Sequence, residues 1–159
     1  MSKRRILACA LLALATVSSA SPGDVTQLEF RHVSTGYFDE GIVDGQNKLV
    51  PSIRFALHNK SDASVSTVQL NVQFIRAGDD GPRDEVLVRA IDGGGLQAQQ
   101  ATSPIAVRAK VGYTGPQARA EMLQHSDFVD MRARVFGKAG SAQWTQIGEF
   151  PIERKLVTQ

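Results

Sequence analysis

Strict alternation of apolar and polar residues is the feature that most constrains how this chain can fold. Between residues 68 and 74, apolar side chains take every even position and polar side chains take every odd one. Because successive side chains of a β-strand point to opposite faces, a period of two predicts a half-buried strand. Residues 53–58 alternate in the same way, with Arg54 and His58 predicted to face outward, and the polar cluster at residues 59–64 predicts a turn between the two strands.

Similar segments recur along the chain at intervals of about 10 residues, separated by turn signals. Further strands are predicted at residues 25–33, 85–90, 105–111, 129–136 and 143–152. About seven strands with this spacing predict an all-β fold, a single immunoglobulin-like β-sandwich.

Two segments between the predicted strands do not alternate. Residues 117–125 follow Pro116 and contain good helix formers, so one short helix is predicted there. Residues 34–47 are acidic and rich in glycine, and they are predicted to form a long loop. No βαβ rhythm is present, which argues against a parallel nucleotide-binding sheet.

The first 20 residues have the pattern of a cleaved secretory signal peptide. Three basic residues precede an apolar run at residues 6–17, and the small side chains of Ser18 and Ala20 follow. Cleavage is predicted after Ala20, which leaves a mature domain of residues 21–159 that is periplasmic or secreted. The apolar run is shorter than the roughly 20 residues of a membrane span, so no span is expected after cleavage. An uncleaved anchor and a lipoprotein attached at Cys9 are the alternatives.

Removal of this segment changes the composition of the chain. It holds three of the 18 basic residues and none of the 16 acidic ones, so the mature chain carries 15 basic and 16 acidic residues. This balance gives no reason to expect nucleic acid or anionic lipid as a partner. The single cysteine, Cys9, leaves as well, so the mature domain has neither a disulfide nor a thiol, and it must rely on a hydrophobic core.

Recognised signatures of catalysis or metal binding are absent from the sequence. His32, His58 and His125 are widely spaced, so neither a metal nor any other cofactor is predicted. Acidic clusters at residues 39–44 and 79–85 lack the spacing of a calcium loop, and solvated turns explain them more simply. The serines occur in no nucleophile motif. No catalytic residue and no metal ligand is therefore assigned.

Outward-facing basic residues occur on two predicted strands. Arg108 and Lys110 belong to one of them, and Arg132 and Arg134 belong to the other. If these strands were neighbours, the four side chains would form a basic stripe able to bind anions. A solvated sheet face is the simpler interpretation.

Residues 55–62 read Phe-Ala-Leu-His-Asn-Lys-Ser-Asp, and the alternating residues 68–74 follow them. Over residues 50–112 this pattern resembles the bacterial FxLYD-type domains and the related LEA-type sandwiches of the cell envelope. The chain departs from that pattern at residues 96–99, where Leu-Gln-Ala-Gln replaces a turn containing Pro-Gly. The resemblance implies an immunoglobulin-like sandwich and brings no catalytic residues.

These observations favour a non-enzymatic binding or accessory module of the envelope that contacts a protein partner through loops or a sheet edge. Residues 34–47 and 113–125 are the predicted contact segments, with Tyr37, Phe38 and Tyr113 as the candidate partner-binding residues. One alternative is a domain that binds calcium or a small ligand through its acidic loops. Another is a hydrolase of unrecognised type. The sequence leaves the oligomeric state open.

Overall fold

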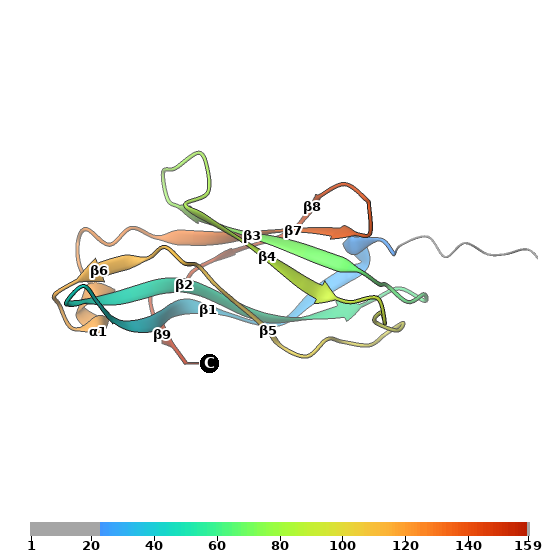
Figure 1. Cartoon of the computed structure of the whole chain (residues 1–159), viewed down its shortest axis with the longest axis horizontal. Helices are drawn as coiled ribbons and strands as arrows, with labels where there is room; N and C mark the ends of the chain where they lie inside the picture. The colour runs from blue at the N-terminus through green and yellow to red at the C-terminus, as the bar shows by residue number, and fades with distance from the viewer. Residues whose placement is uncertain (1–22, 159) are drawn as a thin grey trace, which may run out of the picture.

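The computed structural model describes residues 23–158. The predicted signal peptide, its cleavage site and the alternative lipidation site at Cys9 lie outside the described residues. The chain forms two packed β-sheets with one short helix at one end (Figure 1). The elements in chain order are η1 (Val25–Gln27), β1 (Leu28–Val43), β2 (Gln46–Asn59), β3 (Val68–Arg76), β4 (Asp84–Ile91), β5 (Ile105–Arg108), β6 (Tyr113–Gly115), α1 (Arg119–Met122), β7 (Met131–Ala139), β8 (Thr145–Pro151) and β9 (Leu156–Val157).

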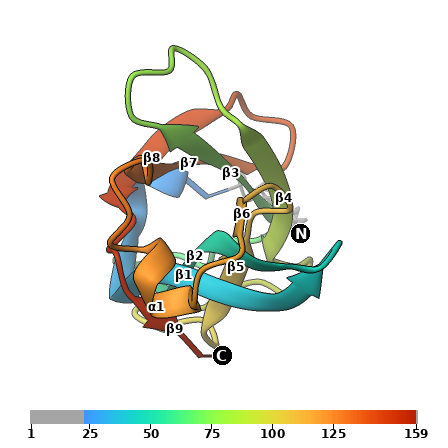
Figure 2. The same ribbon diagram turned by 90° about the vertical axis from the view of Figure 1, so that its left-hand side faces the viewer.

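The path of the chain between the sheets confirms the predicted β-sandwich. The first sheet has the strand order β5-β2-β1-β9, with β6 also paired to β2, and the second has the order β4-β3-β7-β8. Of the strand pairs in the described residues, only the short β1–β9 pair is parallel. The hairpins β1–β2 and β3–β4 lie in opposite sheets, and β5 returns to the first sheet before β7 and β8 complete the second (Figure 2). This is the arrangement of an immunoglobulin-like sandwich.

The core lies between the inner faces of the two sheets. In β3 the alternation works as predicted, because the four apolar residues at positions 68, 70, 72 and 74 are fully buried while the polar residues between them are more exposed. The largest fully buried side chains opposite them come from β1 and β2. They include Tyr37, Leu49, Ile53, Phe55 and Leu57.

The predicted loop at residues 34–47 is wrong, because most of it lies in the β1–β2 hairpin. Asp44 and Gly45 form the two-residue turn, with φ angles of +50° and +77°. Asp-Gly with both φ angles positive is the preferred turn of a tight hairpin. Two irregularities interrupt β1, near His32 (φ +53°) and near Gly41 (φ +86°). Bulges of this kind break the alternation, which explains why the strand reads as a loop.

His58 lies on the outer face of the first sheet with Arg54, as predicted, but it is buried there rather than exposed to solvent. Its side chain is covered by the segment that precedes β5, where Ala101 forms an isolated bridge with it. The Nε2 atom lies 3.1 Å from the carbonyl oxygen of Gln99. A covering segment that is 40 residues distant in sequence leaves no trace in the local pattern.

The other predicted elements are present with altered ends. The predicted helix is present as the single turn α1, and the strand predicted at residues 105–111 ends at Arg108. Among residues 23–158, no helix has the length and hydrophobicity needed to cross a membrane.

The side of the sandwich between β1 and β8 is closed by a buried hydroxyl. Thr35 Oγ1 donates a hydrogen bond of 2.9 Å to the carbonyl oxygen of Pro151 and accepts one of 3.2 Å from the N–H of Glu153. Close by, the ring of Phe30 packs edge-on against Phe150 of the second sheet, with ring centroids 5.0 Å apart. These contacts join the two sheets along this seam.

Candidate functional site

A groove of about 330 Å³ lies on the outer face of the first sheet, and we call it the arginine groove. Strand register explains which side chains meet there. Ser34 of β1 pairs with Arg54 of β2, and Ser52 of β2 pairs with Arg108 of β5. Alternate residues of a strand share one face, so these four side chains lie on the same side of the sheet. The groove is lined by Ser34, Phe38, Ser52, Arg54, Ala106, Arg108, Leu156, Val157 and Thr158.

The C-terminal strand β9 forms one wall of the groove. It lies close to Gly36 of β1, where an added Cβ would stand 2.4 Å from a methyl group of Val157 and 2.8 Å from the carbonyl oxygen of Lys155. That carbonyl accepts a 2.8 Å hydrogen bond from the N–H of Tyr37. Glycine at position 36 therefore allows the C-terminal segment to pack directly on β1.

Phe38, which pairs with Val157 of β9, and Arg108 of β5 form another part of the lining. The guanidinium carbon of Arg108 lies 3.4 Å from the centroid of the Phe38 ring. This stacking holds a long, flexible side chain in a fixed place and leaves its N–H groups free to bind an acceptor. Of the predicted contact residues, Phe38 is the one that lines this groove.

The two arginines of the groove have no acidic partner among residues 23–158. Neither Arg54 nor Arg108 forms a salt bridge or a side-chain hydrogen bond there. Arg132 and Arg134 differ, because both contact Glu149 on the neighbouring strand β8. They also lie in the other sheet, so the basic stripe considered from the sequence does not form. A pair of arginines beside two serine hydroxyls suits a carboxylate or another oxyanion.

Tyr37 lies in the core and cannot contact a partner, which corrects its prediction as a contact residue. Its exposed fraction is 0%, and its ring packs edge-on against Phe128 at a centroid distance of 4.9 Å. Burial raises the pKa of the Tyr37 hydroxyl far above its usual value, with a smaller contribution from Tyr113. Phe38 faces the opposite side of the same strand, as neighbours in a strand must.

Tyr113 is half-buried at the end of the sandwich that carries α1. Its ring lies 6.2 Å from that of Tyr37 and 4.3 Å from that of Phe128, and its hydroxyl donates to the carbonyl oxygen of Val129. Burial also raises the pKa of this hydroxyl. Cavities of about 220 and 130 Å³ border Tyr113 on its two sides. The structure thus brings Tyr113 together with Tyr37, on the opposite face of the sheet from Phe38.

The two predicted contact segments meet at this end, where the start of β2 pairs with β6. Asn47 Nδ2 donates a 2.8 Å hydrogen bond to the carbonyl oxygen of Gln117, and Arg119 forms a salt bridge with Asp39. Hydrogen bonding to Arg119 lowers the pKa of Asp39, and the backbone N–H of Gly41 adds to the effect. These contacts tie the hairpin to the helix.

The acidic clusters are occupied by contacts within the protein. Glu40 lies 3.3 Å from Lys48 Nζ, Asp79 pairs with Arg83, and Asp84 accepts the backbone N–H of Lys110. Within the part of the chain that the structure describes, no group of three His, Cys, Asp or Glu side chains is placed to hold a metal ion.

Each histidine lies in a separate place. His32 is exposed at the irregularity in β1, and His58 is buried with its Nδ1 3.6 Å from Glu29 Oε2. His125 and Asp127 both line the 220 Å³ cavity beside Tyr113, with Nδ1 and Oδ2 3.8 Å apart. His125 Nδ1 accepts the backbone N–H of Asp127, and no serine among the described residues lines the cavity. The hydrolase alternative stays a prediction.

Sequence reasoning missed most of the arginine groove. It placed Arg54 and Arg108 outward correctly, but it did not bring them together and it gave no role to Ser34, Ser52 or the C-terminal segment. The outward positions of Arg54 in one alternating strand and Arg108 in another were the available signal. Only the β2–β5 register shows that they share a face.

No protein-family model matches this sequence, and a search of the curated proteins finds no match. Among solved structures, the chain is similar to the X-ray structure of Northeast Structural Genomics Consortium target SoR45. The two share 13% sequence identity with a TM-score of 0.45, over 80% of this chain and 86% of the other. We draw neither fold nor function from this similarity.

Proposed function

We propose that the protein is an exported, non-enzymatic binding module of the cell envelope, and that its arginine groove binds carboxylate groups of a protein partner. The observation that carries this proposal is that Arg54 and Arg108 line one groove and have no acidic partner among residues 23–158. Arginine binds carboxylates through two parallel N–H···O hydrogen bonds, which favours a specific acceptor over diffuse charge.

The groove has the features of a binding site rather than a catalytic one. Its polar groups are guanidinium and hydroxyl groups, and among residues 23–158 its lining contains no histidine, carboxylate or cysteine to act as a base or nucleophile. Ser52 is only 7% exposed, so its hydroxyl lies at the bottom of the groove. Apolar side chains of β9 complete the wall. This mixture of apolar wall and positive charge suits a protein side chain bearing a carboxylate.

Charge reversal tests this function. The purified protein is immobilised and exposed to envelope extract, alongside the variant Arg54→Glu/Arg108→Glu. A matched control, Lys60→Glu/Lys138→Glu, makes the same change in net charge away from the groove. We expect a protein that is retained by the wild type and by the control, lost with the groove variant, and released by soluble polyglutamate.

Raising the salt concentration should weaken the same retention, because exposed ion pairs are screened. A partner held equally well by the groove variant would refute the proposal. Circular dichroism of both variants verifies that the sandwich is intact. Export is tested separately by cell fractionation and by mass spectrometry of the mature N-terminus, which we expect at Ser21.

A further inference from the structure

The strand β5 is the edge of the first sheet, and its backbone presents free hydrogen-bonding groups. Within the described part of the chain it pairs only with β2. The N–H of Ala109 donates a 2.9 Å hydrogen bond to the carbonyl of Pro51, which extends the β2–β5 register. In antiparallel pairs alternate residues exchange hydrogen bonds, so Val107 bonds to β2 while the backbone of Ala106 and Arg108 points away. With residues 23–158 as possible partners, neither of these two residues takes part in a backbone hydrogen bond outside the strand ladders.

The outer side of this edge leads into the arginine groove. The side chains of Ala106 and Arg108 lie on the groove face, beside Arg54 and Ser52 on β2. Cross-strand neighbours in a sheet lie about 5 Å apart. Outward side chains of a strand added to β5 would therefore lie beside Ala106 and the backbone of Arg108, with Arg54 one strand further in. The side chain of Arg108 itself extends over β2 to Phe38. A carboxylate on the added strand would therefore enter the groove across the small side chain of Ala106 and meet the guanidinium group of Arg54 first.

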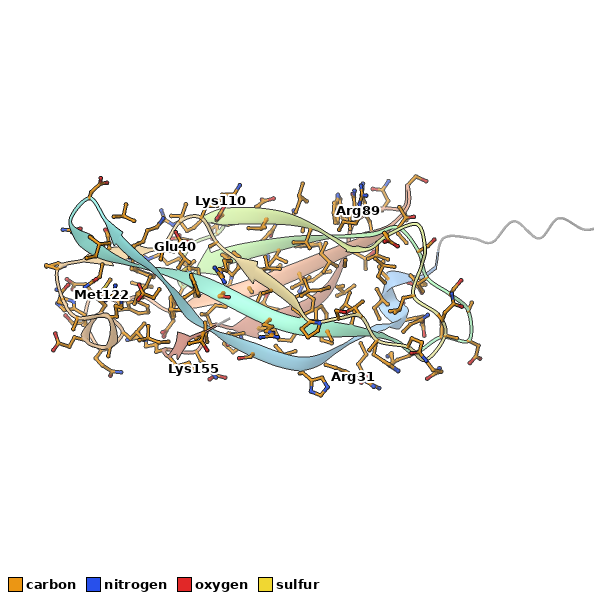
Figure 3. All side chains as sticks on the ribbon, turned by 60° about the horizontal axis from the view of Figure 1, so that its bottom comes forward. Arg31, Glu40, Arg89, Lys110, Met122 and Lys155 are labelled. Atoms are coloured by element: carbon orange, nitrogen blue, oxygen red, sulfur yellow. The ribbon has the colours of Figure 1, made fainter. Side chains whose placement is uncertain are left out.

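Further positive charge lies along the same side of the sandwich. Figure 3 shows Arg89 of β4 and Lys110 along this side, away from Lys155 near β9. Neither Arg89 nor Lys110 forms a salt bridge with another residue of the described part of the chain. Like-charged side chains guard an edge against a second copy of the same chain, and they attract an acidic strand instead.

The inner side of the edge faces an incompletely covered seam between β5 and β4. Ile105 of β5 packs against the core but is only partly buried. The same holds for the inward-facing residues of β4, which are Val86, Val88 and Ala90. A cleft of about 450 Å³ opens at this seam between Ala90 and Ile105. The opposite seam is closed by Thr35 and by Phe30 against Phe150. Inward side chains of an added strand would cover this exposed apolar surface.

Contacts at both ends limit the length of the open seam. At one end the Asp84 carboxylate accepts the N–H groups of Lys110 and Val111. At the other end Val65 and Leu96 exchange two backbone hydrogen bonds, of 2.7 and 3.0 Å. A short extended segment fits between these ends, and a longer strand would meet them.

We infer that the free edge of β5 accepts a short extended segment of the partner protein, in which carboxylate and aliphatic side chains alternate. The carboxylates enter the arginine groove, the aliphatic side chains cover the β4–β5 seam, and the backbone pairs with Ala106 and Arg108. This inference rests on the proposed function and specifies the chemistry of the partner. Strand addition supplies backbone hydrogen bonds for affinity, and the alternating side chains supply specificity.

Alternating glutamate–valine peptides with blocked termini test this arrangement. Binding to the purified protein is measured by isothermal titration calorimetry and compared with a peptide of the same composition in which all glutamates precede all valines. We expect the alternating peptide to bind at least about tenfold more tightly. Only in this peptide can the glutamates face the groove and the valines face the seam while the backbone pairs with β5. Amide hydrogen exchange at Ala106 and Arg108 should slow when it binds.

N-methylation of the peptide isolates the backbone contribution while the protein stays unchanged. An antiparallel strand directs its glutamate N–H groups toward β5, whereas a parallel strand directs its valine N–H groups there. Methylation of the N–H groups that face β5 should weaken binding at least about tenfold, while methylation of the N–H groups that face away should leave binding nearly unchanged. A loss on glutamate methylation would show an antiparallel strand, and a loss on valine methylation would show a parallel one. Equal effects of both sets, or no effect of either, would overturn strand addition.

The same peptides separate the two proposals. In one outcome, the peptide in which all glutamates precede all valines binds as tightly as the alternating peptide, and Arg54→Glu/Arg108→Glu abolishes binding of both. The groove then binds carboxylates, but no strand is added. If the arginine variant binds the alternating peptide as tightly as the wild type does, both the groove function and strand addition are overturned.

Discussion

The guanidinium carbon of Arg108 lies 3.4 Å from the centroid of the Phe38 ring, although the two residues belong to strands that do not pair with each other. The strand between them, β2, presents Ser52 opposite Arg108. A serine is small enough to let the arginine side chain pass over β2 and reach β1. The contact therefore joins three strands across the outer face of the sheet.

A double-mutant cycle measures this contact. We expect Phe38→Leu and Arg108→Gln to show a coupling of about 0.5–1 kcal/mol in the free energy of unfolding, as partly exposed cation–π pairs do. Urea denaturation of the four proteins provides the measurement. As a control, Phe38→Leu combined with Arg54→Gln should be additive within about 0.5 kcal/mol. Equal coupling in both cycles would show that the stacking contributes nothing specific.

Substitution of Tyr37 should change stability rather than binding. Its hydroxyl is buried and has no hydrogen-bond partner within the part of the chain that the structure describes. An unsatisfied buried polar group costs about 1–3 kcal/mol, so Tyr37→Phe should raise the free energy of unfolding by about 1 kcal/mol. The matched change Tyr113→Phe removes a hydroxyl that donates to Val129, and it should lower stability by about 1 kcal/mol. A loss of stability in Tyr37→Phe would show that its hydroxyl is bonded.

Alkaline pH should unfold the protein as its tyrosines ionise. Burial raises the pKa of both Tyr37 and Tyr113, and these are the only tyrosines in the sequence. A raised pKa in the folded state stabilises the fold fully below the unfolded pKa of about 10, and this contribution is lost as the pH rises toward the folded values. Tyrosinate absorbance should therefore appear together with the loss of near-ultraviolet circular dichroism. Tyrosinate forming in a protein that stays folded would contradict this expectation.

Thr35→Val should weaken the closed seam of the sandwich. Valine has nearly the shape of threonine, but it leaves the carbonyl of Pro151 and the N–H of Glu153 without their partner. We expect a loss of about 1–3 kcal/mol in the free energy of unfolding, measured by urea denaturation. Thr145→Val removes a hydroxyl from an exposed strand position as the control, and it should have little effect. Similar losses in both variants would assign the effect to the strand rather than to the seam.

Local alternation predicted much of this fold because it depends only on neighbours in the chain. The pattern at residues 68–74 identified β3, and the outward direction of Arg54 and Arg108 followed from the same rule. The β1–β2 turn was also present in the sequence, since Asp44-Gly45 is a hairpin signal, but the bulges near His32 and Gly41 obscured the strand that leads to it.

The candidate site could not be predicted to the same extent. Its lining comes from positions 34–54, 106–108 and 156–158, which lie far apart in the sequence. Tyr37 and Phe38 are adjacent aromatic residues with similar sequence surroundings, yet one fills the core and the other stacks under Arg108. Which of two neighbours faces inward depends on the sheet that packs against the strand.

The sequence by itself therefore determined that the chain is built mainly of β-strands with two unlike faces, because a period of two matches the alternation of side chains in a strand, and the number and spacing of these strands predicted an all-β sandwich. Only the tertiary structure decided that Arg54 and Arg108 share a groove, that His58 and Tyr37 are buried, and that β5 keeps a free edge beside an open seam. These features depend on strand register and on sheet packing, which join residues that the chain separates by 40 or more positions.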